Sequence, residues 1–396
     1  MTVAVLAIFV AAYAGLALGR IPGLAIDRTG IAVVAAILVV AIGAVPPGEV
    51  LGAIHFPTLV LLFALMVVSA RFAAAGAYDV LAARIAAAAG SPMRLLVLAT
   101  CACGLLSAVL VNDVVVFVMT PLLVRGIAAR GLDPRPFLAA LAGAANAGSA
   151  ATIIGNPQNI VIGQVGGLDF AGFVLACAPP AAAALATTIL CVRLAWAREL
   201  AAAPTSPAPA VPLLDRAQAA KAGIATLAML ALFLSPVPRE LAAAGVAGLL
   251  LASRRFPSGD MLRAVDWPLL LLFAGLFVLN HALAGTGLAR AAAGQLDALG
   301  IGPGTLSGML PFALVASNTI GNVPAVVMLL AAQPGWSEGA LQALALTTTL
   351  AGNFLLVGSI ANLIVAERAA GAGVRFGLAD HARAGVPISA MKSIPS

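Results

Sequence analysis

Four clusters of amide side chains interrupt apolar runs of this chain, two in each half. Amides beside a broken helix could bind an ion or a small polar solute, because they offer oxygens and N–H donors without a buried charge. Gly or Pro at such a break also frees carbonyls for a cation and leaves N–H groups at a positive helix end for an anion. The clusters are Asn112-Asp113, Gly155-Asn156-Pro157-Gln158-Asn159, Ser317-Asn318-Thr319-Ile320-Gly321-Asn322-Val323-Pro324 and Gly358-Ser359-Ile360-Ala361-Asn362.

A kink packed against a neighbouring helix is the ordinary explanation of one such interruption. Four interruptions at matching positions of two halves favour a binding site, since unwound backbone at membrane depth is tolerated only where protein or a water-filled cavity satisfies it. No resident metal is expected, beyond a transported Na⁺. The candidate substrate- and ion-binding residues are Asn112, Asp113, Gly155, Asn156, Pro157, Asn159, Ser317, Asn318, Thr319, Asn322, Gly358, Ser359 and Asn362.

Asp113 is the only acidic residue in the middle of a long apolar run. Acids inside a membrane are costly and usually face a cavity, so Asp113 is a candidate proton carrier or cation ligand. The alternative is that it caps the half-helix that starts at Val114, and the two roles are compatible. Its counterpart in the second half is Val323. Coupling to H⁺ or Na⁺ is therefore expected mainly in the first half.

The composition is that of a membrane protein. Hydrophobic residues make up 62% of the chain, charged residues 9%, and the mean hydropathy is +1.09, whereas about a quarter of a soluble domain is charged. Apolar runs of about 17 to 25 residues are each long enough to cross a hydrocarbon core of ~30 Å as a helix. We expect an all-α, multi-pass protein in contact with lipid, in the bacterial cytoplasmic (inner) membrane.

The two halves read as diverged copies. Gly48–Pro57 parallels Gly259–Pro268, and each segment precedes a similar apolar run. The same alignment places Asn112 opposite Asn322, and further along Gly155 opposite Gly358 and Asn159 opposite Asn362. We therefore predict one transmembrane repeat in residues 1–200, a Pro-rich linker in 201–216 and a second repeat in 217–396, whose last span is truncated.

Basic residues predict the topology, because cytoplasmic loops collect Lys and Arg. With the N-terminus outside, a re-entrant hairpin over Pro57–Ala88 and a crossing over Met93–Leu123 would place the loop of Arg125, Arg130 and Arg135 inside. Continuing the alternation makes the repeats inverted, each with about five spans, a hairpin and broken helices. Arg71, within the predicted hairpin, either attracts an anion or snorkels to the interface, and it stays outside the candidate site together with His281.

Other functional classes find no support in the sequence. The 21 basic residues are scattered, without the aromatic-interleaved cluster of a nucleic-acid-binding protein. Cys101 and Cys103 could bind a soft ion, but positions i and i+2 face different sides of a helix, so packed thiols are favoured. No His-Glu-x-x-His motif, paired intramembrane aspartates or Ser/His dyad is present, so neither an enzyme nor a cofactor is expected. A passive channel remains the third alternative.

The chain resembles the ion transporter superfamily of arsenite efflux permeases, sodium/proton antiporters, citrate carriers and divalent-anion/sodium symporters. Ser317-Asn318-Thr319 is similar to the ion-binding triplet of the dicarboxylate symporters, "NVPAVVML" from Asn322 to the Asn-x-Pro element of the anion permeases, and "GNPQN" to a Gly-x-Pro-x-Asn element. The resemblance implies two clamshell halves, elevator or rocking motion, and a homodimer. The first half departs from it, with Asn112-Asp113 in place of Ser-Asn-Thr.

The function predicted from these observations is secondary active transport of a small inorganic or organic anion, coupled to H⁺ or Na⁺ by alternating access. Within the same class, the alternatives are an arsenite or antimonite efflux permease and a Na⁺/H⁺ antiporter. The sequence does not distinguish the substrate, because backbone ends and amides serve many ions alike.

Overall fold

The protein is all-α, as predicted. The computed structural model describes residues 1–19, 21, 23–88, 91–207, 210–298, 306–332 and 335–392, and these contain helices and loops but no strand. Several helices start at an aspartate that accepts a hydrogen bond from a backbone N–H of the first turn, as Asp27, Asp169 and Asp266 do. The boundaries therefore follow from local sequence signals.

The helices of the first half are α1 (Thr2–Leu18), α2 (Arg28–Ala41), α3 (Val50–Ala53), α4 (Phe56–Ala74), α5 (Ala77–Ala87), α6 (Pro92–Val109), α7 (Asn112–Ala128), α8 (Arg135–Ser149), α9 (Pro157–Val165), α10 (Phe170–Ala195) and α11 (Ala197–Leu200). Those of the second half are α12 (Arg216–Phe233), α13 (Arg239–Leu251), α14 (Ser258–Arg263), α15 (Trp267–Gly285), α16 (Leu288–Ala298), α17 (Leu306–Thr319), α18 (Asn322–Ala332), α19 (Glu338–Ala351), α20 (Ile360–Gly371) and α21 (Leu378–Lys392). Short 3₁₀ turns lie at Pro47–Glu49 and Leu356–Gly358.

Helix length and composition agree with a multi-pass membrane protein. By these criteria α4, α6, α10 and α15 are each able to cross a membrane, and α1, α2 and α18 are shorter apolar helices. Many apolar side chains lie on the outside of the molecule, among them Val3, Leu175 and Leu249. Such a surface suits lipid, since soluble monomers rarely expose large apolar patches.

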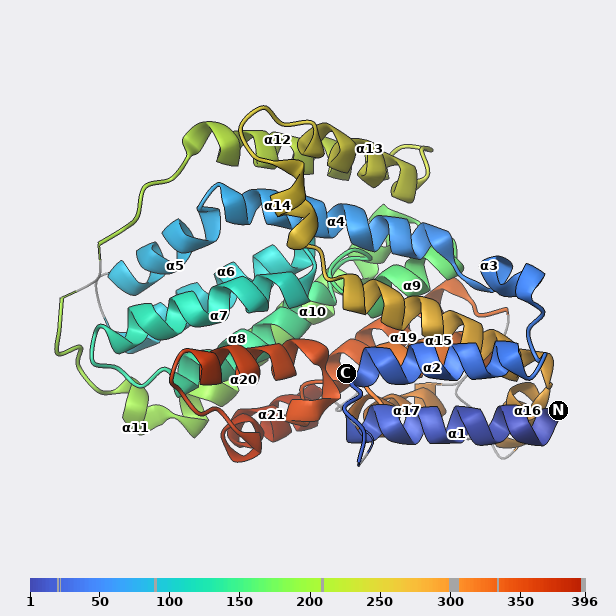
Figure 1. Ribbon diagram of the computed structural model, residues 1–396. Helices are drawn as coiled ribbons and strands as arrows, with labels where there is room; N and C mark the ends of the chain where they lie inside the picture. Colours follow the sequence, from blue (N-terminus) through green and yellow to red (C-terminus); the bar gives the residue numbers. More distant parts are fainter. Residues whose placement is uncertain are drawn as a thin grey trace.

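The two halves interlock rather than stand apart. In Figure 1, α12 and α13 lie along one side of the molecule over α4, and α1 and α2 lie along the opposite side beside α15. Thus α13 of the second half packs on α4 of the first, and α2 of the first half packs on α15 of the second. Between these layers α7 packs on α20 and α9 on α18, again one helix from each half. This exchange of partners is the pattern expected of two related repeats, and their inverted orientation stays a prediction.

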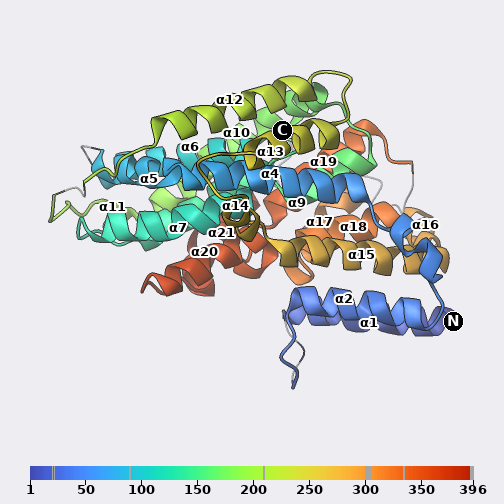
Figure 2. The same ribbon diagram turned by 45° about the horizontal axis from the view of Figure 1, so that its top comes forward.

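The hairpin predicted over Pro57–Ala88 is wrong. α5 continues beyond the end of α4 in both views instead of returning beside it (Figures 1 and 2). The hairpin is formed by α6 and α7, which turn back after Leu110 and pack against each other. Arg130, which follows α7, donates from Nη1 to the carbonyls of Ala86 (2.8 Å) and Ala88 (3.2 Å), which precede α6. Both open ends of the α6–α7 hairpin therefore lie at the same end of the molecule.

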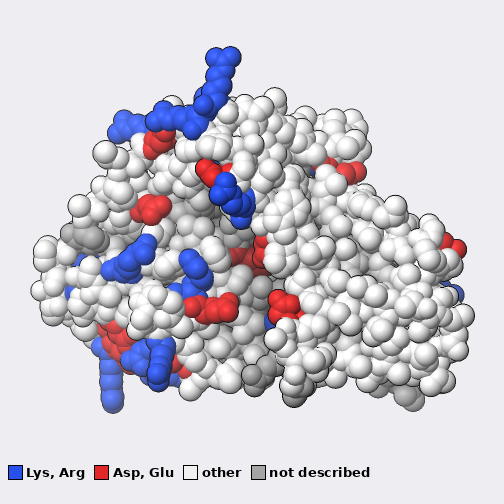
Figure 3. All heavy atoms as spheres, in the orientation of Figure 1, with Lys and Arg blue, Asp and Glu red and all other residues white. Residues whose placement is uncertain are grey.

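The different position of the hairpin does not change the side of the membrane that is predicted for the Arg125–Arg135 loop. In the observed arrangement, α4 and α5 together would cross the membrane once, and the α6–α7 hairpin would then return to the side from which it started. The predicted order, a hairpin and then a crossing, also contains one crossing. The loop after α7 is therefore on the same side in both arrangements. The charge distribution fits this arrangement, because Lys and Arg gather over the left part of Figure 3, whereas the right part is largely uncharged. Cytoplasmic surfaces of membrane proteins are enriched in Lys and Arg.

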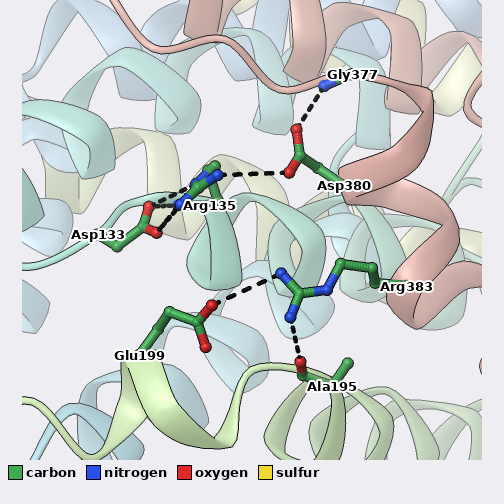
Figure 4. Close-up of polar contacts among 7 residues, drawn as sticks. All are labelled: Asp133, Arg135, Ala195, Glu199, Gly377, Asp380 and Arg383. Atoms are coloured by element: carbon green, nitrogen blue, oxygen red, sulfur yellow. Dashed lines mark hydrogen bonds and ion pairs between the residues drawn. The ribbon is translucent and has the colours of Figure 1, made fainter.

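The segment predicted to be a truncated last span forms α21, which is shorter than its counterpart α10 and packs against it. Two arginines attach it at the charged end (Figure 4). Arg383 lies 3.6 Å from Glu199 and stacks over the buried ring of Trp196 at 4.0 Å. Arg135 pairs with Asp133 at 2.6 Å and reaches Asp380 of α21 at 3.8 Å. The C-terminal helix is thereby tied to α8, α10 and α11.

Candidate functional site

The first break lies between α8 and α9, where residues 150–156 leave the α-helix. Asn156 caps α9, because its side chain accepts a hydrogen bond from the Asn159 N–H at 2.8 Å. The Asn159 amide donates to the carbonyls of Ser149 (3.2 Å) and Thr152 (3.0 Å). A Cβ at position 155 would collide with the Ser149 carbonyl, which explains Gly155. Asn159 thus holds the unwound segment from which its own helix starts.

The second break, between α19 and α20, is built in the same way. The Asn362 amide donates to the carbonyls of Gly352 (2.8 Å) and Leu355 (3.3 Å). A Cβ at Gly358 would collide with Oδ1 of Asn318. Asn159 and Asn362 therefore make equivalent hydrogen bonds to the backbone of the break in their own half. They are also the two residues that the sequence alignment pairs.

The tip of each hairpin rests against the break of its own half. In the first half, the Asn112 N–H donates to the Gly155 carbonyl at 2.9 Å. In the second half, the α17–α18 turn uses Asn318, whose side chain donates to the Ala351 carbonyl (2.9 Å) and accepts from the Leu355 N–H (3.0 Å). Each tip and its break form one hydrogen-bonded unit.

Asn146 of α8 connects the first half to the second break. Its Nδ2 donates to Oδ1 of Asn353 (2.8 Å) and Oδ1 of Asn362 (3.1 Å), and its Oδ1 accepts from the Ser359 hydroxyl (3.0 Å). Asn146, Asn353 and Asn362 are fully buried, and Ser359 is nearly so. Three side-chain hydrogen bonds thus join elements more than 200 residues apart in sequence.

Thr349 of α19 makes the reciprocal connection to the first break. Its hydroxyl accepts from the amides of Asn156 (3.2 Å) and Gln158 (3.2 Å), and it donates to Oδ1 of Asn159 at 3.3 Å. Neither Thr349 nor Asn146 was among the residues predicted from the sequence. An isolated amide within the Ala- and Gly-rich α8 was a signal for Asn146, whereas Thr349 stands among other threonines that carry no distinguishing pattern.

The four interruptions therefore meet in the interior of the molecule. Helices α7, α9, α18 and α20 begin there, and α6, α8, α17 and α19 end there. We call this region, which consists of the two hairpin tips and the two helix breaks, the junction. Each helix start carries about half a positive charge and each helix end about half a negative charge, so both signs of partial charge are present without ionised side chains. Such a junction can stabilise an anion and a cation at neighbouring points.

Three side-chain oxygens at the hairpin tips lack a hydrogen-bond partner among the described residues. They are Oδ1 of Asn112, Oδ2 of Asp113 and Oδ1 of Asn322. All three side chains are buried, with 2 to 6% of their surface exposed. At the second break, Nδ2 of the buried Asn353 also lacks a partner among the described residues. Because a buried polar atom without a partner is costly, these atoms are well placed to bind an ion or a solute. Asn112 and Asn322 are again the positions that the alignment pairs.

Two of the predicted residues lie away from this arrangement. Thr319 is exposed, and its hydroxyl donates to the Val315 carbonyl (2.8 Å) and the Ala316 carbonyl (3.2 Å) of its own helix. Ser317 is buried beside α19, where its hydroxyl lies 3.4 Å from the Thr348 carbonyl. The Ser-Asn-Thr triplet is therefore divided, and only Asn318 reaches the break. Pro157 occupies the first turn of α9, where proline is well tolerated.

A cavity of about 270 Å³ lies beside the junction, between α9, α15 and α18. Its wall is mostly apolar and includes Val161 and Phe277, with His55, Asn280 and His281 as polar members. Asn280 is also bonded to the Tyr13 hydroxyl at 2.9 Å, which lies 3.3 Å from the carbonyl of Pro324 in α18. The cavity thus adjoins two of the helices that start at the junction, without reaching the hairpin tips.

Comparison with known proteins gives one family match and several relatives. The family model described as "Citrate transporter" matches residues 5–351. An uncharacterized transporter of Mycobacterium tuberculosis is 29% identical over 429 residues, covering 100% of this chain and 97% of the relative. An inner membrane protein of Escherichia coli is 30% identical over 332 residues, covering 80% and 81%. A silicon efflux transporter of Oryza sativa is 34% identical over 187 residues, covering 47% of this chain and 39% of the relative.

Proposed function

Because the chain belongs to the citrate transporter family and is a membrane transporter, we propose that it carries a small anion by secondary active transport, coupled to H⁺ or Na⁺. The observation that carries this proposal is the junction itself, where two hairpin tips and two helix breaks meet and are bonded across the halves by Asn146 and Thr349. Two inverted repeats would give alternating access around such a fixed site.

The role proposed for each residue depends on whether its polar atoms are already hydrogen-bonded within the protein or are available to a ligand. Helix starts at α7, α9, α18 and α20 would face the anion. The unpartnered oxygens of Asn112 and Asp113 at one hairpin tip, and of Asn322 at the other, would be available to the coupling cation. The amides of Asn159 and Asn362 would keep the breaks in shape, since they are already bonded to backbone carbonyls. Asp113 is the one ionisable member of the candidate set, so a proton is the alternative to Na⁺ at its carboxylate.

Reconstitution into liposomes tests the proposal. Citrate, which the family description suggests, is the first probe, and it should accumulate inside the vesicles when an inward Na⁺ or H⁺ gradient is imposed. Uptake that only equilibrates, with either gradient and with other anions as well, would indicate a passive channel and would reject coupling. Comparing the two gradients separately identifies the coupling ion.

Asp113→Asn tests the coupling role directly. The substitution keeps the size of the side chain and removes its charge, so gradient-driven accumulation should be abolished while the protein still folds. Asp79→Asn is the matched control, because Asp79 lies in α5 away from the junction. An unchanged ion dependence in Asp113→Asn would reject the role of Asp113 while leaving transport itself intact.

A second candidate is efflux of arsenite, antimonite or a similar oxo-acid, or Na⁺/H⁺ exchange. Two relatives that cover part of the chain are a silicon efflux transporter and a putative transporter arsB of Dictyostelium discoideum. No candidate residue at the junction is basic, and neutral hydroxylated solutes need no counter-charge. Arsenite resistance in a sensitive host would identify efflux, and a Na⁺-dependent pH change in vesicles would identify exchange.

Cellular location and assembly complete the proposal. We propose the bacterial cytoplasmic membrane, as the name of the Escherichia coli relative suggests, with the Arg125–Arg135 loop on the cytoplasmic side. Labelling a cysteine introduced at Arg125 from either side of intact cells tests the orientation. A homodimer in lipid is proposed from the family resemblance alone, and cross-linking in native membranes tests it.

A further inference from the structure

Arg71 is a buried cation that forms no ion pair with an acidic side chain among the described residues. It lies in the last turn of α4 with 3% of its surface exposed. Its Nη2 donates to the side chain of Gln218 and to the Ser253 hydroxyl (3.1 Å), and the guanidinium stacks 4.6 Å from the centre of the Phe256 ring. Its Nε and Nη1 have no hydrogen-bond partner among the described residues. Because a buried unpaired charge is strongly destabilising, Arg71 needs an anion nearby.

Asp215, the acid whose charge acts on Arg71, is shared with a second cation. Asp215 lies at the start of α12, where it accepts a hydrogen bond from the Gln218 N–H at 3.2 Å. Its other oxygen forms an ion pair with Arg255 at 3.1 Å. Since Asp215 already neutralises Arg255, the group formed by Arg71, Asp215 and Arg255 keeps one net positive charge.

Basic residues lie on the elements that pack over Arg71. The start of α12 and the turn between α13 and α14 carry further cations. These residues are Arg216, Lys221 and Arg254. Figure 3 shows basic side chains over the upper edge, where Figure 1 places the beginning of α12. In the proposed topology the cytoplasmic end is the left part of this view, toward which α12 begins, and the phosphates of the inner leaflet lie at that end.

Donors are available at the surface above Arg71. The Ser253 oxygen accepts from Arg71 Nη2 and from the N–H groups of Arg255 (3.3 Å) and Phe256 (3.4 Å), which leaves its hydroxyl hydrogen to donate. The Arg255 side chain is 65% exposed. Exposed apolar residues of α12, Ile224 and Leu227, continue from this point along the membrane-facing side. A phosphate with hydrocarbon chains attached fits both the donors and the apolar surface.

We propose that Arg71, Ser253 and Arg255 form a binding site for the phosphate of an anionic phospholipid of the inner leaflet. The lipid phosphate receives hydrogen bonds from Ser253 and Arg255 and compensates the charge of Arg71 beneath them. Its acyl chains lie along α12. The site joins α4 to α12 and the α13–α14 turn, so a bound lipid stabilises the contact between the two halves at this end.

Binding is measured on the purified full chain in detergent, by native mass spectrometry and thermal melting. Phosphatidylglycerol should give retained lipid adducts and a higher melting temperature, whereas phosphatidylcholine and inorganic phosphate should not. Arg71→Gln should weaken phosphatidylglycerol binding about tenfold or more, as the loss of a charge-assisted interaction predicts. Arg254→Gln is the control, since Arg254 is exposed beside the site and its loss changes only the general charge.

Two outcomes would overturn the site. Equal stabilisation by inorganic phosphate would show a simple anion site, and unchanged phosphatidylglycerol binding in Arg71→Gln would show that the general basic surface suffices. If Arg71→Gln does not fold, Ser253→Ala and Arg71→Lys test the site instead. Both variants keep the positive charge at position 71. Ser253→Ala removes a hydroxyl donor, and Arg71→Lys replaces the planar guanidinium by an ammonium group. Binding as tight as wild type in both would also reject the proposal. None of these measurements depends on transport activity.

Discussion

Replacing Asn146 by alanine should weaken the attachment of the second break to the first half. Asn146 makes three side-chain hydrogen bonds, to Asn353, Asn362 and Ser359. Side-chain hydrogen bonds inside membrane proteins contribute on average about 0.6 kcal/mol each, so Asn146→Ala should lower the free energy of unfolding by about 2 kcal/mol. That is a shift of roughly 30-fold in the unfolding equilibrium.

A double-mutant cycle separates one bond from the rest. The Ser359 hydroxyl donates to Asn146, so Ser359→Ala in an Asn146→Ala background should cost less than Ser359→Ala alone. The difference should be about 0.6 kcal/mol, the value of one such bond. Additive effects would mean that the bond between these two side chains contributes nothing to stability.

Equilibrium unfolding in mixed micelles of SDS and a mild detergent is the assay. Thr187→Ala is the control, because the exposed Thr187 hydroxyl donates only within its own helix, to the Ala183 carbonyl. The control should remain within about 0.5 kcal/mol of wild type, as surface substitutions usually do. If Asn146→Ala also fell within that margin, the view that Asn146 holds the two halves together would be refuted.

Three further predictions concern other parts of the molecule. Gly155→Ala should abolish transport and lower the melting temperature, because the added methyl group collides with a backbone carbonyl. Tyr13→Phe should destabilise the protein by about 1 kcal/mol, through the lost bond to Asn280, in the same unfolding assay. Burial raises the pKa of Asp133, but bonds from Arg135 hold it below its ordinary value. Wild type should therefore lose melting temperature as the pH falls below about 4, and Arg135→Gln should lose less over that interval.

The positions of the breaks were predictable from the sequence. Gly155, Asn156 and Pro157, set side by side within an apolar run, predict a helix break, and the second break at Gly358 follows from the alignment of the halves. The pairing of Asn159 with Asn362 also predicted that the two residues do equivalent work, and their hydrogen bonds to backbone carbonyls agree with it. These inferences needed only local chemistry and one internal comparison.

The hairpin could not be placed by the same reasoning. Arg71 and Asp79 in an apolar run suggested a turn at the membrane surface, since a charge inside a crossing is costly. The structure instead buries Arg71 against Gln218 and Ser253, which belong to the second half and lie 147 and 182 residues away. No local pattern reveals a partner at that distance. The true hairpin turns beside Asn112, where the sequence showed only a break.

The contrast between satisfied and unsatisfied amides carries the strongest argument about the site. The side-chain N–H groups of Asn159 and Asn362 donate hydrogen bonds to carbonyls of the unwound segments. These carbonyls can therefore be buried with a hydrogen-bond partner. The breaks are then rigid supports, held together by Asn146 and Thr349. Asn112 and Asn322 instead keep a buried oxygen without a partner at the end of each hairpin. A ligand that binds at the junction gains the most free energy where it provides a partner for such an oxygen. Ligand affinity should therefore change more on substitution at the hairpin tips than on equivalent substitution within the breaks.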